Sequence, residues 1–280
     1  NNIEFIQISS QGDGIDFGDL TRAAFQVGGA GSNIRGVFAG GDPGPSSSDV
    51  IDYITLASSG DAIDFGNLSA GGRCAGGASS QTRALFGGVN STNVIDYVQI
   101  QTLGNALDFG DIANGQSGTK GYLTSSPTRF FYFSGNNDVA NIEFGTIASL
   151  GNTTTFGDST SIARRKNFAS NTTRAIFAGG YTGSTPNQQQ YKAMDFITMA
   201  SDGNAVVFGD LIVARSRINM TGNERTCLMA GGHTTPQTMT PSIEFVNYSS
   251  LGNAQQFGDL SITKSQGAAT SDSHGGLGGY

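Results

Sequence analysis

Short apolar segments, separated by turns rich in Gly, Ser, Thr and Asn, follow one another along the whole chain. None of them keeps the 3.6-residue spacing of an amphipathic helix over a useful length. Apolar runs bounded by turn-forming residues are typical of β-strands. The pattern therefore predicts an all-β protein built from many short strands.

A Phe-Gly-Asp element marks a repeat, and Asn replaces the Asp once. Its copies are IDFGDL (15–20), IDFGNL (63–68), LDFGDI (107–112), TTFGDS (154–159), VVFGDL (206–211) and QQFGDL (255–260). Each copy follows a Gly-Asn or Gly-Asp pair, which tolerates the positive φ of a tight hairpin. Asn67 keeps the side-chain oxygen of the Asp and loses its charge. We therefore interpret the Asp as a turn cap that accepts a backbone N–H, at the corner of an outer strand.

Two further segments recur with this element. One is a strand with an acid before an aromatic, and its acids are Glu4, Asp52, Asp96, Glu143, Asp195 and Glu244. The other is a glycine-ended apolar run that starts with a base: Arg35, Arg83, Arg129, Arg174, Arg225, and His274 in the degenerate run HGGLGGY (274–280). A buried carboxylate without a partner is costly. We therefore expect these arginines to form structural ion pairs with the acids.

The acid–aromatic strand returns at intervals of about 44 to 52 residues, a period typical of propeller blades and other repeat arrays. Each unit holds a small-residue strand, the glycine-ended run, the acid–aromatic strand and the Phe-Gly-Asp strand. Four short strands per period, over about six periods, predict a β-propeller.

The units resemble the kelch repeat. The resemblance rests on Arg22 or Arg215 shortly after the outer strand, a double glycine as in VFAGG, the acid-then-Tyr strand IDY and the Phe of the Phe-Gly-Asp strand. Phe stands where the outer strand of kelch repeats has Trp. The resemblance implies blades of four antiparallel strands, named a to d from the axis outwards. The small-residue strand is then a, the glycine-ended run b, the acid–aromatic strand c and the Phe-Gly-Asp strand d.

In this assignment the chain starts with strands c and d (2–17) and ends with strands a and b (265–280). We therefore expect one domain, residues 1–280, forming a six-bladed propeller. Its last blade would be closed by strands from both the N- and the C-terminal segment, which leaves no free sheet edge.

The composition of the chain excludes several classes of function. Charged residues make up 13% of the chain and the formal net charge is −7, which argues against a nucleic-acid partner. No apolar run approaches the length of a membrane span. Two histidines and the distant Cys74 and Cys227 supply neither a metal cluster nor a nucleophile with its base. We therefore expect no metal, no cofactor and no catalytic residue, and thus a non-enzymatic protein.

The b–c loops, where the repeats differ most, are the candidate binding face, because loops on a rigid frame carry recognition. The loop YTGSTPNQQQYKA (181–193) combines Tyr with amides, a composition suited to sugars or polar protein surfaces. The candidate loop residues are Asp42, Asn137, Tyr181, Asn187, Gln188, Gln189, Tyr191 and His233.

The segment IDYITLASSGDAIDFGNL (51–68) and its copies also resemble repeat proteins of the virions and tails of tailed bacteriophages. This resemblance implies an extracellular virion-surface or tail-fibre protein, part of a larger oligomeric assembly, that contacts another virion protein or a host surface glycan. The alternative is an intracellular kelch-type adaptor that binds a peptide or protein partner. Such adaptors usually carry an Arg-rich loop face, and the b–c loops of this sequence lack one.

Overall fold

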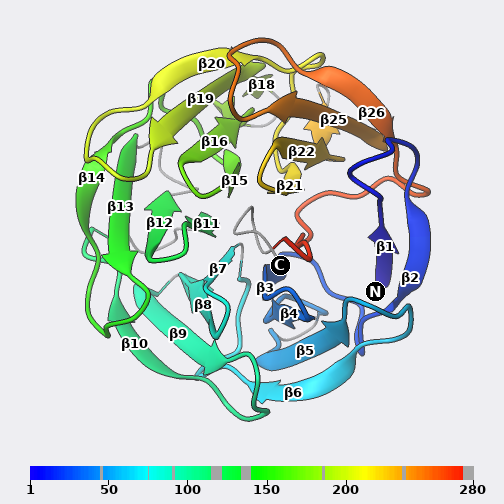
Figure 1. Ribbon diagram of the computed structural model, residues 1–280, viewed down its shortest axis with the longest axis vertical. Helices are drawn as coiled ribbons and strands as arrows, with labels where there is room; N and C mark the ends of the chain where they lie inside the picture. Colours follow the sequence, from blue (N-terminus) through cyan, green and yellow to red (C-terminus); the bar gives the residue numbers. More distant parts are fainter. Residues whose placement is uncertain are drawn as a thin grey trace.

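The computed structural model describes residues 1–44, 47–74, 76–89, 92–114, 122–133, 140–184, 187–234 and 238–273. These residues form a ring of antiparallel sheets around a central axis (Figure 1). None of the described segments is a helix that could cross a membrane. The prediction of an all-β propeller is confirmed, with five blades of four antiparallel strands.

The strands of the first three blades run in the predicted order, a to d from the axis outwards. The first blade contains β3 (Gly28–Gly31), β4 (Arg35–Ala39), β5 (Val50–Thr55) and β6 (Ile63–Asn67). The second contains β7 (Gly77–Ser79), β8 (Arg83–Gly87), β9 (Val94–Gln99) and β10 (Leu107–Asp111). The third contains β11 (Tyr122–Ser125), β12 (Arg129–Phe133), β13 (Asn141–Thr146) and β14 (Thr154–Asp158).

The last two four-stranded blades carry an extra hairpin in the b–c loop. The fourth contains β15 (Asn167–Ser170), β16 (Arg174–Ala178), β19 (Ala193–Thr198) and β20 (Val206–Asp210). The fifth contains β21 (Asn219–Gly222), β22 (Thr226–Ala230), β25 (Ser242–Asn247) and β26 (Gln255–Asp259). The hairpins are β17 (Tyr181–Thr182) with β18 (Gln189–Gln190), and β23 (His233–Thr234) with β24 (Thr238–Met239).

A two-stranded sheet, β1 (Asn2–Phe5) with β2 (Ile15–Asp19), lies between the fifth and the first blade (Figure 1). On its axial side the chain passes as an irregular segment, in which Ser271 donates to the carbonyl of Gly222 at 2.7 Å. Residues 274–280, the expected strand b, lie outside the described residues. Within the described residues this sheet therefore has two strands where the prediction gave it four.

The Phe of the Phe-Gly-Asp element is buried in every copy. Its ring meets the aromatic ring of the neighbouring strand c edge to face, with centroids 5.8–6.2 Å apart in all six sheets. This geometry suits the opposite charges of ring edge and ring face. The repeated aromatic pair thus fills the space between strands c and d.

The end of each strand d is tied to the next sheet. The backbone N–H of Asp19 donates to Asp61 Oδ1 at 2.9 Å. The corresponding bonds, at 2.9–3.1 Å, join Asn67 to Asn105, Asp111 to Asn152, Asp158 to Asn204, Asp210 to Asn253 and Asp259 to Asp13. The prediction that the Asp of the element is the cap is therefore wrong. It supplies the N–H, and the cap is the Asn or Asp of the next hairpin.

The Gly of the element is required by this contact. A Cβ on Gly157 would collide with the carbonyl group of Gly203 in the next hairpin, and the corresponding collision occurs in the other five copies. The two backbones can approach this closely only because no side chain stands between them. The conserved shape of the corner is thus a joint between sheets.

Serine hydroxyls join the inner strands. Ser79, Ser125 and Ser170 each donate to a carbonyl of strand a in the preceding blade, at 2.7–2.8 Å. Small residues let these strands converge on the axis, where the remaining channel is only about 70 Å³ in volume. The small-residue strand a predicted from the sequence is thus the inner wall of the ring.

We predict that Gly157→Ala lowers the free energy of unfolding by roughly 1–3 kcal/mol, because the added methyl group forces the two sheets apart. Chemical denaturation would measure the loss. Gly267→Ala is the matched control, since a Cβ there meets its nearest atom at 3.4 Å, an ordinary contact. Equal stability of the two variants would contradict the close contact between Gly157 and the carbonyl of Gly203.

Candidate functional site

The b–c and d–a loops leave the blades at the same end, because neighbouring strands are antiparallel. Isolated bridges join them pairwise: Phe25 with Asp42, Arg164 with Tyr181 and Ser216 with His233. We call this end the loop face. Its described residues are 20–27, 40–44, 47–49, 68–74, 76, 88–89, 92–93, 112–114, 140, 159–166, 179–184, 187–192, 211–218, 231–234, 238–241 and 260–266.

Two of the candidate binding residues build the loops themselves. The Asp42 carboxylate forms an ion pair with Arg73 at 2.7 Å and accepts the N–H of Gly44. The Tyr191 hydroxyl lies 2.9 Å from Thr182 Oγ1 across the β17–β18 hairpin. Asn137 lies outside the described residues.

The tip of the β17–β18 hairpin presents the predicted amide groups. Asn187 and Gln189 are exposed and Gln188 is half-buried. The backbone of Asn187 is fixed by its N–H, which donates to the carbonyl of Ser184 at 2.7 Å. The amides of Asn187 and Gln189 are thus accessible on the loop face.

Tyr181 and His233 come together through Arg217, which the sequence analysis did not single out. The Arg217 guanidinium lies over the Tyr181 ring, 5.5 Å from its centroid, and Nη1 is 3.4 Å from His233 Nδ1. His233 Nε2 lies 2.7 Å from the hydroxyl of Ser265. Residues from two b–c loops and two d–a loops therefore meet here.

Some of the exposed apolar side chains lie on this face, and others lie on strand d and at the c–d turns. Those on this face have exposed fractions of 43–54%, and they are Phe25, Ile162, Ile212, Val213, Met239 and Ile262. They come from the d–a loops and from the β23–β24 hairpin. Such side chains can contribute apolar contacts to a partner of the loop face.

Four equivalent residues near the ends of the d–a loops have a left-handed backbone. Gln26, Arg165, Arg217 and Gln266 have φ of 56–60°. Backbone bonds link them around the axis, from Gln26 N–H to the Gln266 carbonyl, from Gln266 to Arg217 and from Arg217 to Arg165. This conformation costs a non-Gly residue roughly 1–2 kcal/mol. Strain repeated at the mouth of a channel marks a candidate functional position.

The side chains of these residues form a cluster with Tyr122, which we call the axial cluster: Gln26, Tyr122, Arg165, Arg217 and Gln266. Arg165 Nη1 donates to Gln266 Oε1 at 2.6 Å, and the amide oxygen of Gln26 accepts from Nη1 and Nη2 of Arg165. Burial raises the pKa of the Tyr122 hydroxyl, and the positive charges of Arg165 and Arg217 oppose that rise. Both guanidinium groups therefore act on one small polar region.

Four of the repeated acids form ion pairs, but with other bases than the predicted ones. The pairs are Arg22 with Asp52 at 2.6 Å, Lys166 with Asp195 at 2.6 Å, Arg215 with Glu244 at 3.1 Å and Lys264 with Glu4 at 2.8 Å. All four bases come from d–a loops, which lie closer to the acids than the start of strand b does. The kelch-like Arg22 and Arg215 were the signal that could have identified these partners.

The predicted partner arginines contact rings and carbonyls instead. Arg35, Arg83, Arg129 and Arg174 lie 4.7–5.1 Å from the centroid of the strand c aromatic. Each also donates to a carbonyl of the following blade, namely those of Ile100, Ile147, Met199 and Tyr248. Arg225 is exposed. These arginines therefore join neighbouring blades, and one of them, Arg129, also lies 3.4 Å from the carboxylate of Asp202.

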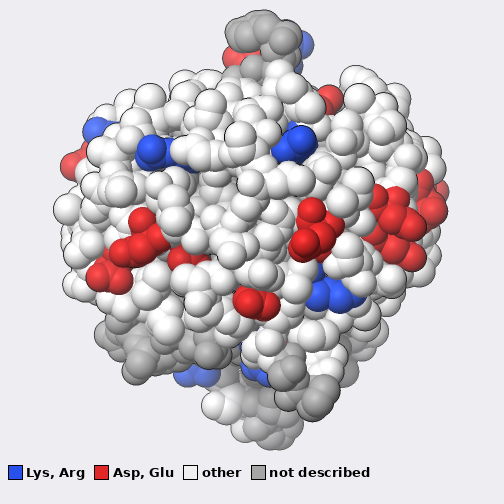
Figure 2. All heavy atoms as spheres, turned by 90° about the horizontal axis from the view of Figure 1, so that it is seen from below, with Lys and Arg blue, Asp and Glu red and all other residues white. Residues whose placement is uncertain are grey.

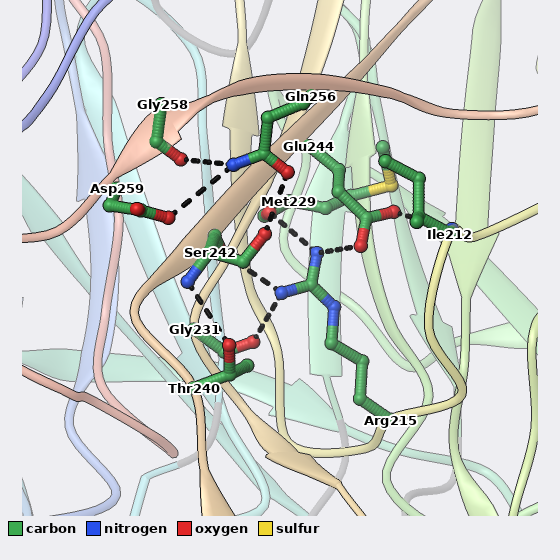
Figure 3. Close-up of polar contacts among 10 residues, drawn as sticks. All are labelled: Ile212, Arg215, Met229, Gly231, Thr240, Ser242, Glu244, Gln256, Gly258 and Asp259. Carbon is green, nitrogen blue, oxygen red and sulfur yellow. Dashed lines mark hydrogen bonds and ion pairs between the residues drawn. The ribbon is translucent and has the colours of Figure 1, made fainter.

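Figure 3 shows how one ion pair anchors a loop of the candidate site. Arg215 donates to the carbonyls of Met229, Gly231 and Ser242 at 2.9–3.0 Å, and Glu244 accepts the N–H of Ile212 at 2.9 Å. Burial lowers the pKa of Arg215, and the Glu244 charge opposes this. The pair thus fixes the d–a loop to strands b and c.

The two remaining acids contact no base among the described residues. Asp96 accepts bonds from the N–H and hydroxyl of Ser69, both at 2.9 Å, and its Oδ1 has no hydrogen-bond partner. Burial raises the pKa of Asp96, against the effect of the Ser69 bonds. Glu143 accepts bonds from the N–H groups of Ala113 and Asn114 and from Thr153.

The two cysteines are buried and unbonded to each other. Burial raises the pKa of both Cys74 and Cys227 to about 12. In the described part of the chain, no group of three or more His, Cys, Asp or Glu could hold a metal ion.

Comparison with protein-family models found no match, and no curated protein showed significant similarity to this chain. The kelch and bacteriophage resemblances therefore rest on the repeat motifs themselves.

We predict that Asp96→Asn raises the melting temperature at pH 7. The pKa of Asp96 is raised in the folded state, so its ionisation above that pKa costs stability, and the cost disappears as the pH falls below the ordinary Asp value. The advantage of the variant should therefore vanish in acid. Asp195→Asn is the contrasting control, because it leaves Lys166 buried without its partner and should cost about 3–5 kcal/mol. A lower melting temperature for Asp96→Asn would contradict this assignment.

Proposed function

We propose that this chain is a non-enzymatic binding and structural module of a bacteriophage virion surface or tail fibre. Its loop face would contact a host surface glycan or another virion protein. The observation that carries this proposal is that repeated and non-repeated residues lie in different parts of the molecule. The repeated Phe-Gly-Asp residues join blades, whereas Asn187 and Gln189 of the β17–β18 hairpin, in a run of amides that no other repeat has, are exposed on the loop face.

The distribution of charge supports a partner recognised by hydrogen bonds and apolar contact. Figure 2 shows the rim of the ring, where acidic side chains lie in small groups and most of the remaining surface is uncharged. The net charge of −7 disfavours nucleic acid as the partner. An extracellular location and assembly into a larger oligomer are part of the proposal.

The kelch-like assignment is supported by Arg22 and Arg215. Each follows a Phe-Gly-Asp strand and binds the acid of strand c in the next blade, Asp52 and Glu244 respectively. In the proposed fold the ring has six blades. Residues 274–280, which lie outside the described residues, would add strand b to the sixth.

An apolar slot supports this closure. It has a volume of about 1090 Å³ and lies between β1 and residues 262–273. Its lining includes Phe38, Ile54 and Leu228 from the two neighbouring blades. The edge of β1 away from β2 pairs with no described strand. A glycine-ended strand b of this chain would pair with that edge and fill the slot.

For the closure, we predict that Leu277→Ala lowers the free energy of unfolding by about 2–5 kcal/mol, as the loss of a buried leucine does. Chemical denaturation measures this. Leu251→Ala is the matched control, since Leu251 is 59% exposed and its loss should cost no more than about 0.5 kcal/mol. Equal effects of the two substitutions would reject the proposed strand.

For the binding function, we expect the immobilised chain to bind defined glycans on an array. Replacing Asn187, Gln188 and Gln189 together by Ser should weaken that binding by roughly tenfold, as the loss of about 1.4 kcal/mol would. The control is Asn33→Ser with Gln101→Ser, two exposed residues of loops at the opposite end of the blades. An unchanged signal in the loop-face variant would remove the loop face from the proposal.

The other outcomes distinguish the alternatives. Binding to a purified virion protein and to no glycan would select the structural role. Tight binding of a peptide would favour the kelch-type adaptor. Turnover of a substrate that a chelator abolishes would contradict the non-enzymatic assignment.

A further inference from the structure

The axial cluster contains two arginines that no carboxylate balances among the described residues. Arg165 is 6% exposed and Arg217 is half-buried. Ion pairs in this region of the chain involve Lys166, Arg215 and Lys264 instead. The Nε groups of both Arg165 and Arg217 are buried without a hydrogen-bond partner. Two positive charges therefore lie together with donors left over.

The positive charge of other buried arginines is balanced by a carboxylate. Arg22 and Arg215 also have a buried Nε without a partner, but each has a carboxylate within ion-pair distance. The described contacts of Arg165 and Arg217 are to neutral groups, the side chains of Gln266, His233 and Tyr181. A buried charge of this kind is unfavourable until an opposite charge reaches it.

The position of the cluster suits a ligand. It lies where the d–a loops meet at the axis, and its half-buried members Arg217 and Gln266 reach the surface of the loop face. Planar guanidinium groups match the two oxygens of a carboxylate. The half-buried amide of Gln266 and hydroxyl of Ser265 are neutral partners for hydroxyl groups next to that carboxylate.

We propose that Arg165 and Arg217 bind the carboxylate of an acidic sugar at the axial end of the loop face. This site rests on the proposed glycan-binding function and names the class of sugar. The carboxylate replaces the missing negative charge, and Gln266 and Ser265 bind the ring hydroxyls. Arg165 and Arg217 are held next to each other by the backbone bond from the Arg217 N–H to the Arg165 carbonyl.

The test is thermal unfolding of the whole chain with sodium glucuronate, compared with glucose and with sodium chloride at equal ionic strength. We expect glucuronate alone to raise the melting temperature, by about 5 °C near saturation. Arg165→Gln and Arg217→Gln should each abolish this shift and weaken binding in calorimetry at least about tenfold. Arg225→Gln removes the same charge from an exposed position outside the cluster and should keep the shift.

Equal shifts with chloride, or shifts that survive in both cluster variants, would overturn the site. Since Arg165 is buried, Arg217→Gln serves as the second variant, and each variant is compared with its own ligand-free melting temperature. An equal shift with inorganic phosphate or with N-acetylglutamate would reject the acidic-sugar assignment. Array binding to neutral glycans without a glucuronate shift would reject this site and leave the proposed function standing. A rise in melting temperature with glucuronate, without binding to any glycan on the array, would support this site and reject the proposed glycan-binding function of the β17–β18 hairpin.

Discussion

The hydrogen bond from the end of each strand d to the Asn or Asp of the next hairpin is the contact on which the ring depends. It recurs in all six sheets at 2.9–3.1 Å and requires a glycine at the joint. Because the bond links neighbouring sheets, it sets the distance and angle between them. The inner serine bonds and the axial backbone bonds then follow at a smaller radius.

This arrangement separates frame from surface. The Phe of the repeat packs inside, its Gly and backbone N–H form the joint, and the acids of strand c hold the d–a loops through bases such as Arg215. The Phe, Gly and backbone N–H of the Phe-Gly-Asp element therefore have structural roles. The loops held by these pairs are the ones that meet at the axis, where Arg217 lies over Tyr181. The binding site proposed for the loop face is therefore positioned by the frame.

Much of the architecture was readable from the sequence because it is repeated. The period, the four strands and their order follow from local patterns, and five blades confirm them. The ion pairs show what the sequence could not predict. Strand b bases such as Arg35 were expected to meet the acids, yet Arg35 lies 4.7 Å from the Tyr53 ring centroid and donates to Ile100, whereas Arg22 binds Asp52. The pattern showed that a carboxylate needs a partner, but only the folded blade shows which base reaches it.

The sequence by itself determined the all-β class, the propeller and the loops on which the repeats differ, because strand periodicity and turn chemistry are local properties. Tertiary structure alone decided what the Phe-Gly-Asp element does and where charge is left unbalanced. The cap of Asp19 lies in another sheet, at Asp61, and Arg165 meets Gln266 from a repeat about a hundred residues away. Contacts of this kind depend on how the sheets close around the axis, which no single repeat specifies.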